Sequence, residues 1–212
     1  MRGLVFVFLC FPIFVFGQVW EVSFGGSSGD YGYSVQQTSD GGYIMTGHTE
    51  SFGNGDDVYL VKADANGVQQ WTKTFGGWDY DDGYSVQQTS DGGFVIVGVT
   101  YSFGNGDGDV YLIKTDSNGI QQWYRTFGGW DYDYGNSVQQ TSDGGYIITG
   151  HTYLGDTLGD VYLIKTNSNG VQQWYKSFGG VDYDEGYCVQ QTSDGGYIVS
   201  GHTRSFGIGA SD

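Results

Sequence analysis

The segment Ser34-Val35-Gln36-Gln37-Thr38-Ser39-Asp40-Gly41-Gly42-Tyr43-Ile44 is one of four closely similar copies in this chain. The other copies span residues 85–95, 137–147 and 188–198, and in the last of them Cys188 replaces the serine. Steps of 51, 52 and 51 residues separate the aspartates of the four copies, which are Asp40, Asp91, Asp143 and Asp194. A period this long and regular indicates a repeat protein in which each unit packs against its neighbours.

Each repeat has the pattern of four short strands joined by tight turns. In the unit from Gly83 to Gly135 we predict strands at 84–89, 94–100, 109–115 and 120–127. Asp91-Gly92 and Asn118-Gly119 are typical of hairpin turns, because glycine readily takes positive φ angles. Four antiparallel strands per repeat, with no helical periodicity in the mature chain, predict an all-β fold, a β-propeller of four-stranded blades. A β-solenoid is the alternative, although its coils are usually shorter and carry fewer hairpin turns.

The repeat boundaries predict an open or incomplete propeller of about three and a half blades. We expect a signal peptide at 1–17, an outer strand at 18–26, blades at 27–77, 78–129 and 130–180, and a partial blade at 181–212. Such an arc would expose apolar surface and unpaired strand edges at its ends. We therefore expect the natural protein to continue past Asp212 with further blades, and the present chain alone to oligomerise or precipitate.

The beginning of the chain has the pattern of a secretory signal. The basic opening Met1-Arg2-Gly3 precedes the apolar run Leu4–Phe16, which is too short to span a bilayer as a helix. A buried strand or an uncleaved anchor is the alternative. The pattern predicts a secreted protein, extracellular or at the cell surface. After cleavage Cys188 is the single cysteine left, so no internal disulfide is expected. We interpret Cys188 as a small buried side chain rather than a reactive thiol.

The charge of the chain excludes two classes of partner. The sequence has 24 acidic and 8 basic residues, a formal net charge of −16. Nucleic acid and anionic membrane both require a basic surface, so neither is an expected partner. Disordered chains are usually poor in aromatic residues, whereas 17% of this chain is aromatic and the rings recur in every repeat. The sequence therefore predicts a folded, acidic protein.

The repeat motifs resemble a known family. Residues 71–77 (Trp-Thr-Lys-Thr-Phe-Gly-Gly), 30–44 and 159–166 (Gly-Asp-Val-Tyr-Leu-Ile-Lys-Thr) are similar to a family of tandem-repeat β-propellers in secreted bacterial and archaeal proteins. The resemblance covers essentially the whole mature chain. Members often end in a sorting domain for type IX secretion, and most have no assigned activity. The resemblance implies a secreted propeller and no particular ligand. Blades of kelch, quinoprotein and FG-GAP propellers resemble these repeats more distantly, and no function transfers from them.

Acidic loops between the predicted blades are candidate calcium sites. Each of three loops places carboxylates two residues apart: Asp79 and Asp81, Asp131 and Asp133, Asp182 and Asp184. Hard oxygen ligands suit calcium, although calcium takes six or more of them. The alternative, which we favour, is that the aligned residues Asp30, Asp81, Asp133 and Asp184 cap a turn by accepting backbone N–H bonds. We accordingly assign no metal, cofactor-binding or catalytic residue, and no cofactor.

Three other sets of side chains recur at aligned positions. His48, His151 and His202 share a position that is Val99 in the second repeat, which favours packing between blades over a ligand or base. The pair Gln36-Gln37 recurs on the strand expected to be innermost, where amides could line a channel. Trp78 and Trp130 could stack on sugar rings. They could equally cover a blade edge, since Val181 and Ser27 replace them in other repeats.

The sequence favours a binding protein over an enzyme. The mature chain has only two arginines, Arg125 and Arg204, and no serine or cysteine in a recognisable nucleophile motif. An active site in a propeller is normally made by residues that differ between blades, whereas these repeats are close to copies. We predict a secreted, non-enzymatic scaffold for an extracellular protein or glycan. The alternative is a secreted hydrolase or quinone-dependent enzyme on a propeller.

Overall fold

The computed structural model describes residues 21–153 and 158–206, and these residues form fourteen β-strands. The strands make three four-stranded sheets and one two-stranded sheet, all antiparallel, with the strands of each sheet in chain order. The all-β prediction is therefore confirmed. The predicted signal peptide at 1–17 lies outside the described residues. Within them, no helix is long and apolar enough to cross a membrane.

The four sheets repeat the same strand lengths. The first sheet contains β1 (Asp30–Gln37), β2 (Tyr43–Thr49), β3 (Asp57–Ala63) and β4 (Gln69–Phe75). The second contains β5 (Asp81–Gln88), β6 (Phe94–Thr100), β7 (Asp109–Thr115) and β8 (Gln121–Phe127). The third contains β9 (Asp133–Gln140), β10 (Tyr146–Thr152), β11 (Asp160–Thr166) and β12 (Gln172–Phe178). The fourth contains β13 (Asp184–Gln191) and β14 (Tyr197–Thr203).

The predicted strands agree with the observed ones to within a few residues. β6 and β7 match their predicted ranges, and β8 starts one residue late. β5 starts three residues early, because the backbone pairs through a bulge between Gly83 and Ser85. The turns form where glycine was expected to permit them: Gly92 has φ of 81° and Gly119 has φ of 73°. Local turn chemistry therefore sets the strand boundaries.

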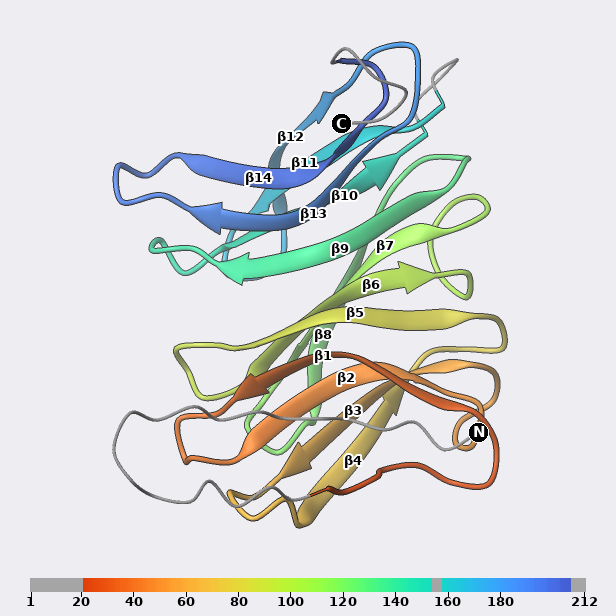
Figure 1. The fold of residues 1–212 in the computed structure, drawn as a ribbon, viewed down its shortest axis with the longest axis vertical. Helices are drawn as coiled ribbons and strands as arrows, with labels where there is room; N and C mark the ends of the chain where they lie inside the picture. Colours follow the sequence, from red (N-terminus) through yellow and green to blue (C-terminus); the bar gives the residue numbers. More distant parts are fainter. Residues whose placement is uncertain (1–20, 154–157, 207–212) are drawn as a thin grey trace.

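The sheets follow one another along the long axis of the molecule (Figure 1). The first strands of successive sheets, β1, β5, β9 and β13, contact one another in turn. Strands β6, β7 and β10 are buried along their whole length, as expected of strands covered on both faces. The core consequently lies between sheets, so each sheet depends on its neighbours for burial.

Aromatic side chains fill the space between neighbouring sheets. The rings of Trp71 and Phe94 lie 5.9 Å apart across the first interface, and Trp123 and Tyr146 lie 5.8 Å apart across the second. Phe75 and Phe127 end the fourth strands and are each 8% exposed under the next sheet. Burial of rings this large stabilises each interface by a few kcal/mol.

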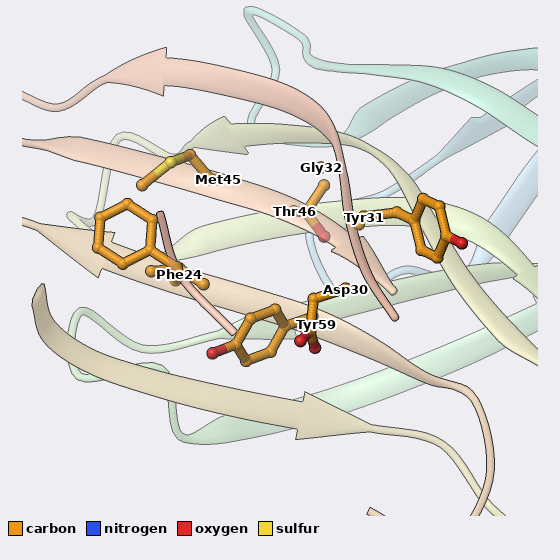
Figure 2. A pocket seen from close by; sticks show the side chains of 9 residues that line it. Phe24, Asp30, Tyr31, Gly32, Met45, Thr46 and Tyr59 are labelled. Atoms are coloured by element: carbon orange, nitrogen blue, oxygen red, sulfur yellow. The ribbon is translucent and has the colours of Figure 1, made fainter. Parts of the chain in front are cut away.

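Residues 18–26 do not form the predicted outer strand over the part that is described. Residues 21–26 have no strand structure. The three third strands, β3, β7 and β11, already pair with a fourth strand of their own, so none is free to pair with this segment. Phe24 instead packs over the outer face of the first sheet, where it lines a pocket of about 40 Å³ with Tyr31 and Met45 (Figure 2). Gly26 N–H donates to Asp30 Oδ2 at 2.7 Å.

Cys188 is exposed, so the interpretation of a small buried side chain is wrong. The hydroxyls of Ser34, Ser85 and Ser137, which occupy this position in the other sheets, accept N–H bonds from the next sheet at 3.3 to 3.4 Å. No described sheet lies against the equivalent face of β13, which leaves the thiol uncovered. Burial at this position therefore depends on the neighbouring sheet rather than on the residue type.

Candidate functional site

The loops between sheets and the loops between second and third strands lie at the same end of the sheets. We call residues 50–56, 76–80, 101–108, 128–132 and 179–183 the loop rim. Backbone hydrogen bonds tie the rim together, because Asp81 N–H donates to Asp56 O at 2.6 Å and Asp133 N–H donates to Gly108 O at 2.7 Å. A side chain on the rim is thus held by a network that crosses from sheet to sheet.

The aspartate that begins each first strand caps the turn before it. Asp81 Oδ2 accepts the Gly77 N–H at 2.9 Å and the Ser102 hydroxyl at 2.6 Å. Asp30, Asp133 and Asp184 accept the N–H of the equivalent glycine at 2.7, 2.8 and 3.0 Å. Burial raises the pKa of Asp81, against the hydrogen bonds from Ser102, Thr100 and Gly77. The turn interpretation is confirmed.

The carboxylates two residues apart do not converge on one point. Asp79 is exposed and accepts the Tyr80 N–H at 3.0 Å, whereas Asp81 is buried against Gly77. Asp131 and Asp182 are likewise exposed while Asp133 and Asp184 are buried. Among the described residues, no group of three or more His, Cys, Asp or Glu side chains could hold a metal ion. The two aspartates of each loop therefore lie in different surroundings, one exposed to solvent and one buried against the turn.

A second set of aspartates, those that begin the third strands, was missed by the sequence analysis. Asp57 starts β3, is 4% exposed, and directs its carboxylate toward that of Asp81 in the next sheet. A Cβ added to Gly76, which lies between them, would be 2.0 Å from Asp57 Oδ1 and 2.6 Å from Asp81 Oδ2. Asp109 and Asp133 meet in the same way at Gly128, and Asp160 and Asp184 at Gly179. Each interface therefore contains two carboxylates and requires a glycine.

Burial raises the pKa values of these third-strand aspartates. The pKa of Asp109 rises to about 6, because burial and the charge of Asp133 outweigh the hydrogen bond from Asn105 N–H. Burial also raises the pKa of Asp57 and of Asp160, and the neighbouring carboxylate adds to the effect in both. The one available sequence signal was that an aspartate begins the third strand in every complete repeat.

Two of the aligned histidines pack between sheets and pair with a carboxylate. His48 is 4% exposed, and its Nδ1 lies 2.6 Å from Asp82 Oδ1 of the second sheet and 3.0 Å from Tyr33 Oη. His151 Nδ1 lies 3.3 Å from Glu185 Oε1 of the fourth sheet. Burial lowers the pKa of His48, but the hydrogen bond and charge of Asp82 outweigh it, so the net pKa is raised. The prediction of packing between sheets is confirmed for these two histidines.

The paired glutamines connect the first strands of neighbouring sheets. Gln36 Oε1 accepts the Gln88 N–H at 2.6 Å, and Gln88 Oε1 accepts the Ser39 N–H at 2.8 Å. The same two bonds recur between the second and third sheets and between the third and fourth. These amides therefore cross-link the array, a role that the sequence analysis did not assign to them.

The two rim tryptophans are the most exposed large aromatic side chains of the described chain. Trp78 is 85% exposed and Trp130 is 84% exposed, while Val181 at the equivalent position of the next loop is 83% exposed. The backbone of each tryptophan lies against a glycine of the preceding sheet's loop, Gly55 or Gly106. The alternative that these rings cover a sheet edge is wrong, since neither ring is covered.

A row of tyrosines runs along the rim beside the tryptophans. Consecutive ring centroids are 6.2 to 6.5 Å apart in the order Tyr80, Tyr101, Tyr132, Tyr153 and Tyr183. The row crosses from the second sheet to the fourth. The exposed carboxylates of Asp79, Asp107, Asp131 and Asp182 lie on the same loops. The rim thus combines flat aromatic faces with hydrogen-bond acceptors, a combination that suits the C–H faces and hydroxyls of sugars.

Comparison with known proteins adds no assignment. No protein-family model matches the chain, and no curated protein matches it.

Proposed function

We propose that the protein is a secreted, non-enzymatic β-propeller module that binds an extracellular glycan or protein through the loop rim. The propeller is supported by three consecutive four-stranded antiparallel sheets with the same strand order, and by first strands that contact one another in turn. Secretion is supported by the basic and apolar opening of the sequence. Small-angle X-ray scattering tests the architecture, because propeller blades form a curved arc and solenoid coils form a straight rod.

The exposure of Trp78 and Trp130 is the observation that carries the binding function. Trp78 and Trp130 are 85% and 84% exposed on loops whose backbone is hydrogen-bonded to the neighbouring sheet, and an exposed tryptophan offers a large flat apolar face to a ligand. The rings occupy equivalent positions in consecutive sheets, so an extended ligand would contact both. The nearby carboxylates would accept hydrogen bonds from sugar hydroxyls. These features favour a glycan over a protein.

A glycan array probed with the chain tests this function. The Trp78→Ala/Trp130→Ala variant should lose at least about fivefold in affinity, because aromatic stacking contributes about 0.5–1.5 kcal/mol per ring. Val181→Ala, an equally exposed change at the equivalent position, is the control and should bind as the unmodified chain does. If the array is blank and an extracellular protein binds through the same tryptophans, the ligand is a protein. Binding that survives loss of both rings would refute the rim as the site.

A further inference from the structure

Five asparagines of the chain precede a glycine, and the fold places them in two different settings. Asn66, Asn118 and Asn169 lie in the hairpins that join third and fourth strands. Asn54 and Asn105 lie in the loop rim, between second and third strands. All five asparagines are exposed. An asparagine before glycine is chemically labile, because glycine has no side chain to keep its amide nitrogen away from the preceding carboxamide.

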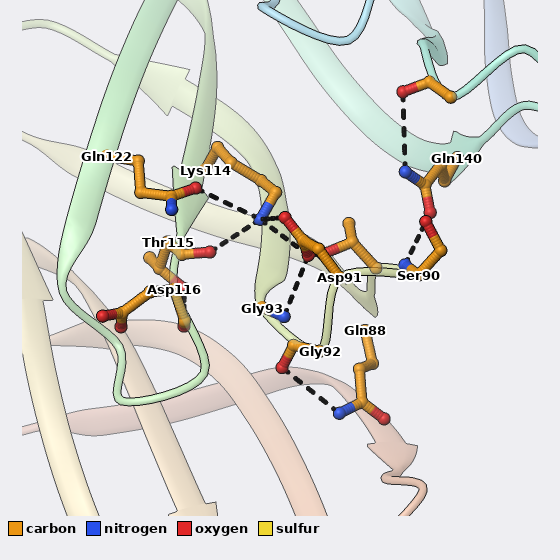
Figure 3. Close-up of polar contacts among 12 residues, drawn as sticks. Gln88, Ser90, Asp91, Gly92, Gly93, Lys114, Thr115, Asp116, Gln122 and Gln140 are labelled. Atoms are coloured by element: carbon orange, nitrogen blue, oxygen red, sulfur yellow. Dashed lines mark hydrogen bonds and ion pairs between the residues drawn. The ribbon is translucent and has the colours of Figure 1, made fainter.

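In the hairpins, the amide of the glycine is held in place. Each glycine N–H donates to the carbonyl oxygen three residues earlier at 3.0 to 3.1 Å: Gly67 to Asp64, Gly119 to Asp116 and Gly170 to Asn167. All three glycines are buried. Figure 3 shows Asp116 at the start of the second hairpin, where its Oδ1 also accepts the N–H groups of Asn118 and Ile120 at 2.8 Å. The glycine amide therefore cannot turn toward the asparagine side chain without breaking the turn.

In the loop rim, the amide of the glycine is not held. Neither Gly55 N–H nor Gly106 N–H donates a hydrogen bond to a described residue. Gly106 is exposed and Gly55 is half-buried. The preceding asparagines are fixed by their own N–H groups, which donate to the aspartate that begins the third strand: Asn54 to Asp57 at 3.1 Å and Asn105 to Asp109 at 2.6 Å. Each loop thus holds its asparagine while the next amide nitrogen is available to react with it.

We propose that Asn54 and Asn105 are sites of spontaneous modification, at which the side chain closes onto the nitrogen of the following glycine. The glycine nitrogen attacks Cγ, so the N–Cγ bond forms and the Cγ–Nδ2 bond breaks. Ammonia leaves with the proton of the glycine N–H. Water then adds to either carbonyl of the cyclic imide and reopens it. Opening at Cγ gives aspartate, opening at the main-chain carbonyl gives isoaspartate, and nothing is oxidised or reduced.

The modification changes the loops that touch the two exposed tryptophans. A Cβ added to Gly55 would be 3.2 Å from Trp78 O, and one added to Gly106 would be 2.4 Å from Trp130 O. Isoaspartate lengthens the backbone by one carbon directly before these closely packed glycines. Both products also replace a neutral amide by a carboxylate. The reaction therefore alters the support and the charge of the rim, and it does not depend on the ligand proposed for the rim.

Peptide mapping by mass spectrometry tests the proposal on the full chain, aged in mildly alkaline buffer made with water that carries heavy oxygen. Asn54 and Asn105 should convert at least about fivefold faster than the three hairpin asparagines, the factor that corresponds to one hydrogen bond of about 1 kcal/mol. Each conversion should take up one labelled oxygen and yield both aspartate and isoaspartate. A product of aspartate alone would show direct hydrolysis of the side chain and would overturn the proposal.

The chain unfolded in urea is the control for the fold, since the turn bonds are then absent and the five rates should converge. Rates that stay as different in urea as in the folded chain would show that neighbouring sequence sets them, which would also overturn the proposal.

A variant of one hairpin provides a matched test. Asp116→Ala removes the acceptor of two N–H bonds and loosens the turn, so Asn118 should convert about fivefold faster. Asn169, in the unaltered hairpin of the third sheet, should keep its rate. A circular dichroism melt confirms that the variant folds. An unchanged rate at Asn118, or equal rates at all five asparagines of the folded chain, would overturn the proposal.

Discussion

At the scale of single residues, each interface between sheets contains a pair of facing residues whose types are matched. His48 faces Asp82 across the first interface, and His151 faces Glu185 across the third. At the interface between them the equivalent residues are Val99 and Tyr134. An interface with a histidine on one side thus has a carboxylate on the other, and the interface with a valine on one side has a tyrosine on the other. A buried charge without its partner is costly, which explains why the two positions vary together.

Exchange of one matched pair for the other tests this coupling. His48→Val should destabilise the chain by about 3 kcal/mol, because it leaves the Asp82 carboxylate buried without the imidazole. Adding Asp82→Tyr recreates the Val99–Tyr134 combination and should recover at least half of that loss. Denaturant unfolding of the two single variants and the double variant measures the coupling. Strictly additive effects would show that the two positions are independent.

At the scale of strands and loops, the fourth strand of each four-stranded sheet packs against the next sheet through its tryptophan. Trp123 of β8 lies against Tyr146 of the third sheet, and a Cβ added to Gly170 in the third sheet's hairpin would be 2.6 Å from its ring. Trp123→Ala should therefore destabilise the chain by about 3 kcal/mol, at the lower end for large core truncations because the ring is only half-buried. Thermal or urea unfolding measures the change.

Trp130→Ala is the matched control, since that ring is 84% exposed and its removal should cost less than about 0.5 kcal/mol. A loss below about 1 kcal/mol for Trp123→Ala would show that the ring contributes little between the sheets.

The rim loops should not respond strongly to calcium. The exposed and the buried aspartate of each loop, such as Asp79 and Asp81, do not converge, and the buried one already accepts N–H and O–H bonds. We expect the melting temperature to be the same in excess chelator and in millimolar calcium. Magnesium serves as the control for ionic strength. A rise with calcium alone would indicate an ion bound to the folded state and would contradict this prediction.

The sequence predicts strands and turns well and predicts contacts between sheets poorly. The strand boundaries follow from local features, such as the glycines at 92 and 119 and the apolar run of β6. The bonds of Gln36 to Gln88, the meeting of Asp57 with Asp81 and the exposure of Cys188 depend instead on residues in another repeat. Periodicity places equivalent residues in register but does not show which of them touch. The replacement of histidine by valine at position 99, where the other repeats have His48, His151 and His202, was the one sign in the sequence of contacts between sheets.

At the scale of the whole molecule, some ionisable groups have lowered pKa values and others have raised ones. The two classes change the stability of the fold in opposite directions as the pH rises. Hydrogen bonds from Thr38 and Lys62 lower the pKa of Asp40 to about 2, and Asp91 also falls to about 2, because its bonds to Thr89 and Lys114 outweigh burial. The stabilisation that these two carboxylates give the folded chain is complete above about pH 3.9, the pKa of aspartate in the unfolded chain. It is lost as the pH falls through about 2, the pKa in the folded chain. Asp109 and His48 have raised pKa values, so their contributions are lost as pH rises through those values.

The chain should consequently be most stable between about pH 4 and 5. Neutral pH ionises Asp109 against Asp133 and adds to the repulsion within a chain of net charge −16. Melting temperatures measured from pH 3 to 8 at constant ionic strength should fall on both sides of the maximum. Asp109→Asn, which keeps an acceptor for Asn105 N–H, should reduce the decline between about pH 4 and 6. A melting temperature that rises steadily from pH 4 to 7 would contradict this assignment.

The matched residue pairs constrain how a gene for such an array can change in length. Recombination between near-identical repeats removes or adds whole units. Loss of the third repeat would place Val99 against Glu185 and bury a carboxylate without an imidazole. Loss of the second and third repeats together would place His48 against Glu185, an imidazole against a carboxylate as before. Viable descendants of this gene should therefore lose these two repeats together more readily than the third repeat alone.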